Sequence, residues 1–572
     1  MLERCELTRP TSIAGALLGA LLLSGAAAHA QPVRGIGEDA LTPPRGSIRV
    51  QVSTSITDFS QRYGRNTVGR PNGSLEPLTA DFSVDTLGVA LFPGLGPVQS
   101  ALRTLTGNSA FTLSLGRLAA LSSVRTQVTP LFVEAGITKR LSLGVLIPIV
   151  SARHLVVLDV NSRGIGGNAS FNPTRTGTGI DAPTAVNTTL VTQLTAAREQ
   201  LAALLTACTA NPASNTSCAR IVANAPTLTV SATAFASAIA QVYGTFSTRA
   251  TASQFVPFTG SAADSAIRNR VTAFRTQFEQ YGITALAAGT SGPAAATAAI
   301  SRDGLQRAVT DTTTLGLGAS PLGTITRQGL GDIEASAKFR LFDTFGVSND
   351  TLRFLPNGTR VRQSIAAAVR LGTGTIDTPE HYLDVGTGDG QTDIEVRSFT
   401  DIAHNRRFFT SIVGRYTVQL PDQLVRRITD TPEQAFAPRW RERMVERNLG
   451  DVIEVSLTPR WMISDFFSLG AQYLFRRKAE DTYAGTFVVP PSESGLPAPV
   501  TLDARTLALE TSGTEQRLGW GLTFSSVAAH ARGKAKLPIE LQYFNSRSVA
   551  GSGGNVPKLS IHQVQIRFYP RG

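Results

Sequence analysis

The stretch GLGDIEASAKFRLFDTFG, residues Gly329–Gly346, alternates between two kinds of side chain from Ile333 onward. Its apolar positions are Ile333, Ala335, Ala337, Phe339 and Leu341. Its polar positions are Glu334, Ser336, Lys338 and Arg340. A period of two is typical of a β-strand with one apolar and one charged face. In a soluble sheet the charged face would point outward, whereas in a membrane barrel it would point into the lumen.

Similar segments recur along the chain and favour the membrane interpretation. Most are 10–14 residues long, which exceeds the ~5–6 residues of a common soluble strand and matches a strand that crosses a bilayer with tilt. We predict twelve strands, which begin near residues 47, 124, 140, 331, 361, 391, 406, 450, 465, 515, 535 and 558.

Apart from the connection at 344–360, which is long for its side, the connections between these strands are short on one side and long on the other, as in bacterial outer-membrane barrels. The short ones lie near residues 138–140, 403–405, 463–465 and 530–534. The predicted fold is therefore an all-β transmembrane protein, a closed antiparallel β-barrel of about 12 strands (range 10–14) with an α-helical insertion.

The N-terminus predicts export. Arg4 and Arg9 precede an apolar run over 13–23, and small residues end at Ala30, which is the pattern of a cleaved signal peptide over 1–30. No later segment is apolar enough for a transmembrane helix. The formal net charge is +12 and the pI about 10.0. The cations are scattered, so we expect contact with outer-membrane lipid and lipopolysaccharide and no binding of nucleic acid.

The sequence divides the mature chain into four regions. Residues 31–46 are expected to form a periplasmic or lumenal segment, and 47–159 barrel strands 1–3 with a long loop at 61–123. Residues 160–330 are rich in Ala and Thr and form a helical insertion, which could be a cap, a plug or a surface loop. Residues 331–572 carry strands 4–12.

Two cysteines follow the signal peptide, Cys208 and Cys218. They lie close together in a chain that is expected to reach an oxidising compartment, so a local disulfide is favoured over a metal or redox site.

Charged residues on the predicted strands are the main candidates for a functional site. An Arg or Lys at the middle of a bilayer costs ~2–4 kcal/mol, so these side chains should face the lumen, where acidic residues of neighbouring strands can pair with them. The pairing would leave either an ion-paired interior without ligand specificity or a cationic lumen that favours anionic solutes, including carboxylates. The lumen candidates are Glu334, Lys338, Arg340, Arg362, Arg370, Arg415, Glu454, Arg460, Arg476, Glu540 and Arg567.

Other chemistry finds little support in the sequence. The glycines near Gly331 precede a strand rather than a helix, so a phosphate-binding loop is disfavoured. Asp384, Asp389 and Asp393 lack the spacing of an EF-hand, and no metal site is predicted. No Gly-x-Ser-x-Gly elbow is present, so we expect no enzymatic activity and no cofactor.

Three segments give a family resemblance: LFVEAGITKRLSLGVLIPIV (131–150), GLGDIEASAKFRLF (329–342) and LGTGTIDTPEHYLDVGTGDG (371–390). In this order they resemble the outer-membrane barrel family of the meta-pathway of phenol degradation, whose proposed role is related to FadL-like channels. The resemblance covers about half of the mature chain and implies a barrel that imports hydrophobic or aromatic small molecules.

Two features depart from that family. The 160–330 insertion is larger than expected, and the chain does not end on an aromatic residue, so Phe568 or Tyr569 would carry the signal for the barrel-assembly machinery.

The expected function is passive uptake of small hydrophobic or aromatic molecules through the bacterial outer membrane, and the expected partner is a small hydrophobic or anionic solute. Two other classes of protein remain as alternatives. A structural or adhesive outer-membrane barrel would use the 160–330 insertion to bind a partner, and a secreted soluble β-protein would carry a helical domain.

Overall fold

The computed structural model describes most of the chain from Glu38 to Tyr569. The described residues are 38–64, 71–92, 95–161, 167–175, 178–213, 215–312, 317–345, 358–405, 407–431, 434, 436–464, 466–496, 498–531, 533–553 and 555–569. The expected signal peptide lies outside them.

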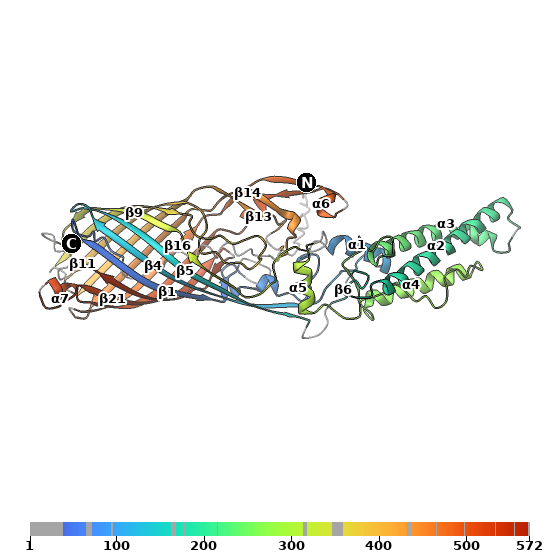
Figure 1. Cartoon of the computed structure of the whole chain (residues 1–572), viewed down its shortest axis with the longest axis horizontal. Coiled ribbons are helices and arrows are strands. Elements are labelled where there is room, and N and C mark those ends of the chain that lie inside the picture. The colour runs from blue at the N-terminus through green and yellow to red at the C-terminus, as the bar shows by residue number, and fades with distance from the viewer. Residues whose placement is uncertain are drawn as a thin grey trace, which may run out of the picture.

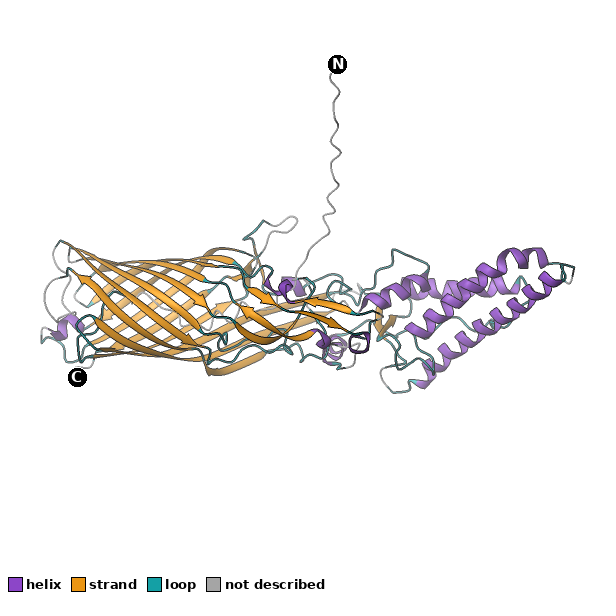
Figure 2. Cartoon of the chain, turned by 90° about the horizontal axis from the view of Figure 1, so that it is seen from above, coloured by secondary structure: helices purple, strands orange, loops and turns teal. Residues whose placement is uncertain are grey.

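Twelve long antiparallel strands form a closed barrel (Figures 1 and 2). Each strand pairs with its neighbours in order, and the first pairs with the last, so every strand is flanked on both sides. This closure satisfies the backbone groups of the wall, as a membrane requires. The strands are β1 (Ile48–Phe59), β4 (Leu118–Gly136), β5 (Leu141–Val160), β9 (Ile333–Asp343), β10 (Thr359–Leu371), β11 (Asp393–His404), β12 (Phe408–Gln419), β15 (Val452–Met462), β16 (Phe467–Lys478), β20 (Gly513–Ser525), β21 (Ile539–Ser552) and β23 (Ser560–Phe568).

Strand β9, on which the sequence analysis began, has its charged face inside. The Glu334 side chain is buried, whereas Phe339 is 41% exposed on the outer surface of the wall. Outward apolar residues recur on the other strands, for example Val455 on β15 and Trp520 on β20. The barrel is thus polar inside and apolar outside, the reverse of a soluble sheet.

The two ends of the barrel differ. Short connections join β4 to β5, β11 to β12 and β15 to β16 at the end that carries the C-terminus, which we call the turn end (Figure 1). The opposite end, here the loop end, carries most of the long connections and the helices other than a short one beside the C-terminal end (Figure 2).

The strand that follows β5 in the wall is interrupted between β8 (Ile325–Leu330) and β9. Both strands pair with β5, but Gly331 and Asp332 between them leave the ladder. The Gly331 N–H donates to the Pro148 carbonyl at 2.8 Å. The Asp332 carboxylate accepts the N–H groups of Gly374 at 2.9 Å and Asp389 at 3.1 Å, so the connection between β10 and β11 packs over the break.

A helical domain projects from the loop end, beyond the barrel (Figures 1 and 2). Strands β4 and β5, with 19 and 20 residues, extend further than the rest of the wall and lead into it. Its elements are α1 (Gly96–Thr106), β6 (Ala169–Phe171), α2 (Asp181–Ala210), α3 (Cys218–Val242), β7 (Phe255–Pro257), α4 (Ala262–Glu279) and α5 (Arg302–Thr310).

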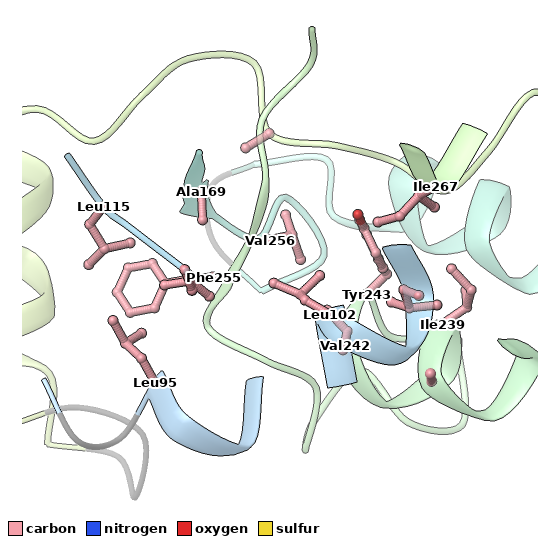
Figure 3. Close-up of a cluster of buried hydrophobic side chains, with 14 of the residues drawn as sticks. Leu95, Leu102, Leu115, Ala169, Ile239, Val242, Tyr243, Phe255, Val256 and Ile267 are labelled. Carbon is pink, nitrogen blue, oxygen red and sulfur yellow. The ribbon is translucent and has the colours of Figure 1, made fainter. Parts of the chain in front are cut away.

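An apolar core holds this domain together. On α2, Leu190, Leu194, Ala197 and Leu201 are buried at spacings of three and four residues, which is the pattern of an amphipathic helix. Figure 3 shows the base of the core, where Leu102 of α1 lies near Val242 of α3 and Val256 of β7. A disulfide joins Cys208 to Cys218 at the tip of the α2–α3 hairpin.

Short strands occupy the long connections of the loop end, which the sequence had indicated only as loops. They form small separate sheets: β2 (Gln61–Tyr63), β3 (Leu75–Pro77), β13 (Asp422–Arg427), β14 (Glu442–Asn448), β17 (Thr482–Ala484), β18 (Thr486–Val489), β19 (Val500–Asp503) and β22 (Val556–Pro557). A short helix, α6 (Pro491–Ser494), lies in the same connections. Another short helix, α7 (Val527–Ala531), lies in the connection between β20 and β21 at the turn end.

None of the helices in the described part of the chain combines the length and the apolar character needed to cross a membrane.

Candidate functional site

The candidate site is the barrel lumen, whose wall is polar and densely charged. All eleven lumen candidates of the sequence analysis occupy inward positions of barrel strands, and each is buried or half-buried. Arg340 lies at the turn-end rim, where it pairs with Asp343 at 3.1 Å.

Ion pairs between adjacent strands, and in one case across an intervening strand, hold most of these charges. Glu334 of β9 pairs with Arg397 of β11 at 2.6 Å and with Arg370 of β10 at 3.7 Å. Arg370 also pairs with Asp393 at 2.6 Å. The strands are registered so that acidic and basic side chains stand opposite each other, which satisfies charges in a region of low dielectric constant.

The same arrangement continues around the wall. Arg415 of β12 pairs with Glu454 of β15, and Arg476 of β16 stands opposite both Glu454 and Glu515 in the strand register. On the far side of the barrel, Arg567 pairs with Glu540 at 3.1 Å.

Aromatic rings face some of the remaining cations. The Lys338 ammonium lies 4.2 Å from the centroid of the Phe399 ring, and the Arg460 guanidinium lies 5.4 Å from that of Phe409. Such cation–π contacts stabilise a charge that is removed from water.

Arg362, by contrast, has an acidic partner on the neighbouring strand, because it pairs with Asp401 at 3.1 Å.

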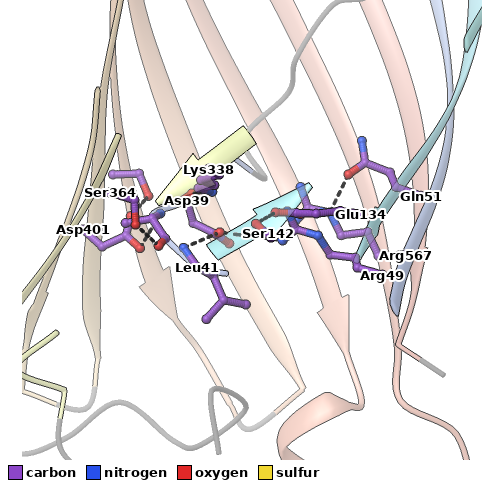
Figure 4. A network of polar contacts seen from close by, with 12 residues as sticks. Asp39, Leu41, Arg49, Gln51, Glu134, Ser142, Lys338, Ser364, Asp401 and Arg567 are labelled. Atoms are coloured by element: carbon purple, nitrogen blue, oxygen red, sulfur yellow. Dashed lines mark hydrogen bonds and ion pairs between the residues drawn. The ribbon is translucent and has the colours of Figure 1, made fainter. Parts of the chain in front are cut away.

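The N-terminal segment Glu38–Thr42 lies inside the lumen (Figure 4). The Ala40 N–H donates to Asp401 Oδ2 at 2.8 Å, and the Ser364 hydroxyl donates to the Ala40 carbonyl at 2.6 Å. The sequence predicted that residues 31–46 are either periplasmic or lumenal, and the described residues Glu38–Thr42 of that segment lie in the lumen.

The two carboxylates of this segment contact cations of the wall. Glu38 forms an ion pair with Arg415, and Asp39 lies 3.8 Å from Arg49. The Lys338 ammonium donates to the backbone carbonyl of Asp39. Arg49 in turn pairs with Glu134, to which the Ser142 hydroxyl donates at 2.5 Å.

These two carboxylates offset part of the charge of the wall. Apart from the Arg340–Asp343 pair at the turn-end rim, eleven cationic side chains of the described barrel strands face the lumen: Arg49, Lys338, Arg362, Arg370, Arg397, Arg415, Arg460, Arg476, Lys478, Arg517 and Arg567. Eight carboxylates face it: Glu134, Glu334, Asp393, Glu395, Asp401, Glu454, Glu515 and Glu540. The wall therefore carries an excess of positive charge, which Glu38 and Asp39 reduce.

Little free space remains beside the segment. A cavity of about 80 Å³ is lined by Asp39, Arg49, Lys338, Arg397 and Arg567, among others. Small-molecule sites commonly measure ~300–1,000 Å³. With the segment in place, this part of the lumen has room for water but not for a solute of ordinary size.

Interlocked connections cover the loop end of the lumen. Arg427 of β13 is 2% exposed and donates to the carbonyls of Leu317 and Gly318, each at 2.8 Å, and of Ala437 at 3.1 Å. The Tyr382 hydroxyl also donates to the Ala437 carbonyl, at 2.5 Å. These contacts join three connections into a cap, which we define as residues 317–322, 376–390, 427–431 and 436–441.

Two ionisable groups of the cap have shifted pKa values. Burial raises the pKa of Tyr382 to about 12. For Asp384, burial acts to raise the pKa, but hydrogen bonds from Arg327 and from the N–H groups of Thr378 and Val385 outweigh it, so the pKa lies below its ordinary value. The Arg327–Asp384 ion pair, at 2.8 Å, links the cap to β8.

The residues proposed for barrel assembly lie at the end of the last strand. Phe568 points outward and is 38% exposed, and the Tyr569 N–H donates to the Pro538 carbonyl at 3.3 Å. No group of three or more metal-binding side chains occurs in the described part of the chain.

Sequence reasoning missed several lumen residues, namely Arg49, Glu134, Glu395, Arg397 and Asp401. Their signal was present, because DIEVRSFTD (393–401) alternates as clearly as the strands that were used. The lumenal position of Glu38 and Asp39 had no comparable signal, since an irregular segment has no period.

Comparisons with known proteins give fold-level likeness only. No protein-family model matches the chain, and no curated protein matches its sequence. The meta-pathway family therefore stays a prediction.

The solved structures that it resembles include outer-membrane channels. One from Pseudomonas putida F1 has a TM-score of 0.38 and 8% identity, over 94% of this chain and 100% of its own. The toluene transporter TodX of Pseudomonas putida has a TM-score of 0.24 and 9% identity, over 96% and 93%. A FadL homologue of Pseudomonas aeruginosa has a TM-score of 0.25 and 8% identity, over 97% and 99%. At these TM-scores the likeness assigns no function, and the fold class rests on the closed strand order itself.

Proposed function

We propose that the chain is a bacterial outer-membrane channel for passive uptake of small hydrophobic or aromatic molecules, including those that bear a carboxylate. The observation that carries this proposal is the obstruction of the lumen by Glu38–Thr42. A short segment held by polar contacts can leave the lumen while the barrel stays folded, which is what a gated passage requires.

The orientation follows from the connections. In outer-membrane barrels the short turns face the periplasm and the long loops face outward. The turn end of this barrel is accordingly periplasmic, and the helical domain and the cap are extracellular. A solute would pass the cap first and the N-terminal segment second.

The charge of the wall supports a preference for anionic solutes. When Glu38 and Asp39 leave, Arg415, Arg49 and Lys338 lose the negative partners that the segment provides. A hydrophobic acid could contact these cations with its carboxylate, through the same charge-assisted hydrogen bonds.

The double variant E38Q/D39N tests the gate. The variant weakens two charged contacts, each worth ~1.5 kcal/mol. The equilibrium between the segment inside the lumen and the segment displaced from it should therefore shift toward displacement by about a hundredfold. We expect a larger single-channel conductance in planar bilayers and faster entry of an aromatic acid into liposomes.

The control is D503N, which removes an exposed carboxylate of the loop end, paired only with Arg505 among the described contacts. It should leave conductance unchanged. The proposal fails if liposomes with the wild-type protein and with E38Q/D39N show no flux of any hydrophobic acid, aromatic compound or ion above that of empty liposomes.

One observation favours a second candidate, a structural or adhesive barrel. The α2–α3 hairpin projects from the molecule, and Val222 and Val230 on α3 are 47% and 70% exposed. Replacing residues 199–227 by a short Gly/Ser linker would separate the two functions. Loss of surface binding with unchanged conductance favours adhesion, whereas unchanged binding to cells leaves the channel as the better proposal.

The proposed function includes no catalysis. A Ser122–His154 hydrogen bond exists, and His154 Nδ1 donates to the Leu383 carbonyl at 2.8 Å. The imidazole is fully buried, however, and its two contacts attach the cap to β4 and β5. A buried, anchoring histidine explains this arrangement without a substrate.

A further inference from the structure

Two arginines stand side by side on the outer surface of the barrel. Arg125 of β4 is directly opposite Arg153 of β5, and both side chains point away from the lumen and are exposed. Residues opposite each other in an antiparallel pair have Cβ atoms ~4.5–5.5 Å apart, and like charges there are destabilising unless an anion joins them.

Among the described residues, a partner side chain is found for only one of the two guanidinium groups. Arg125 Nε pairs with Asp58 Oδ1 of β1 at 2.6 Å, although both side chains are solvent-accessible. Within the described part of the chain, Arg153 makes no hydrogen bond or ion pair, and its neighbour across the other edge of β5 is Thr326 of β8. Arg153 therefore lies beside another cation and has no protein anion as a partner among the described residues, so an external anion could bind there.

The surrounding side chains suit a polar ligand. Gln127 and Ser151 form the adjacent cross-strand pair, and Gln328 Nε2 lies 3.5 Å from Ser151 Oγ. Amides and hydroxyls can donate to phosphate or sugar oxygens. Together with Arg125, Arg153 and Thr326, these three residues form what we call the arginine patch.

The height of the patch places it at the lipid headgroups. Below it, the outward residues of β5 are apolar up to Ile149, which is 58% exposed. From Leu141 to Arg153 the strand rises about 30 Å, at ~3.3 Å per residue and a tilt of about 40°. The apolar band of such barrels is ~25 Å tall, so the patch lies just beyond the hydrocarbon on the loop-end side.

We propose that the arginine patch binds a phosphate group on the lipid anchor of lipopolysaccharide in the outer leaflet. Guanidinium groups match phosphate oxygens through paired charge-assisted hydrogen bonds, and two adjacent arginines offer two such forks. This inference rests on the outer-membrane location in the proposed function, which places the loop end in the outer leaflet.

The test compares the purified full-length wild type with R125Q/R153Q in detergent micelles, by native mass spectrometry. The probes are bisphosphorylated lipid A, fully dephosphorylated lipid A and inorganic phosphate. We expect the variant to bind bisphosphorylated lipid A about tenfold more weakly or worse, because each lost charged hydrogen bond is worth ~1.5 kcal/mol or more. Dephosphorylated lipid A should bind weakly to both proteins.

R477Q is the matched control. Arg477 is an outward, exposed arginine at the loop end of β16, but its cross-strand neighbours are Ile453 and Thr514 rather than a second arginine. It should bind like the wild type. Heat-modifiable gel mobility checks that each variant is folded, and R125K/R153K, which keeps both charges, should recover part of the affinity.

Three results would overturn the proposal: equal affinity of wild type and R125Q/R153Q, an equal loss in R477Q, or displacement of lipid A by millimolar inorganic phosphate. Solute flux measured in parallel separates this site from the channel, because the patch lies outside the lumen. Unchanged flux with lost lipid binding in R125Q/R153Q supports the patch. Lost lipid binding in the variant, together with no flux through the wild type, counts against the channel alone.

Discussion

At the scale of single residues, Arg427 is the side chain on which the cap depends most. Its guanidinium reaches three carbonyls and the Tyr382 hydroxyl while the side chain is 2% exposed. Substitution R427M keeps the apolar stem and leaves these acceptors buried without their donor, each at a cost of ~1–3 kcal/mol. We expect the cap to lose about 3–5 kcal/mol of stability.

Limited proteolysis of the loop end would measure this loss. Cleavage within residues 427–441 should accelerate in R427M, while the barrel keeps its heat-modifiable mobility. R505M provides a comparison, because Arg505 is a 79% exposed arginine whose ion pair with Asp503 is solvated and should contribute little. Equal cleavage rates for R427M and wild type would contradict the role given to Arg427.

Asp384 makes the cap sensitive to acid. Its pKa is lowered in the folded protein, so the stabilisation is fully present above the ordinary value of 3.8 and is lost as the pH falls below it. The protection of residues 376–390 against hydrogen exchange, expressed relative to the intrinsic exchange rate at each pH, should therefore decrease as the pH falls below 3.8. In D384N the protection should be lower at pH 6 and should change less with acid. An unchanged pH profile in D384N would exclude this carboxylate as the cause.

At the scale of elements, the packing of the β10–β11 connection over the break between β8 and β9 requires a glycine at position 388. A Cβ at Gly388 would overlap the Asp332 carboxylate, which already accepts two backbone N–H groups at the break. We expect G388A to displace the β10–β11 connection at a cost of ~1–3 kcal/mol. G323A is the control, because nothing lies within 4 Å of a Cβ at Gly323. The thermal unfolding of the loop end, monitored by proteolysis, is compared between G388A and G323A.

The elements also show where sequence patterns suffice. The long barrel strands were predictable because alternation over nine or more residues is a strong signal. Strands of three to seven residues, such as β2, β3 and β14, were missed because so few positions define no period. Strand β4 begins at Leu118, earlier than the expected 124, since its first residues leave the membrane band and pack on the helical domain instead.

At the scale of the whole molecule, the wall of the candidate site followed from the sequence but its contents did not. The cost of a charge in lipid assigns Arg370 and Glu454 to the lumen from their strand positions alone. The bond from Ala40 to Asp401 spans 361 residues, and no local pattern encodes a contact of that range. The same holds for the cap, where Arg427 meets Leu317 across 110 residues.

The seam of the barrel ties the N-terminal segment to the order of assembly. Glu38–Thr42 precede β1 by only a few residues, and β1 closes the wall by pairing with β23, the last strand to be synthesised. Two of the cations that contact the segment, Lys338 on β9 and Arg415 on β12, lie in the later half of the chain. Glu38–Thr42 are therefore synthesised before every strand of the wall, but they can make all of their observed contacts only after strands β9 to β12 are in place. We infer that seating this segment in the lumen and sealing the barrel are coupled during folding.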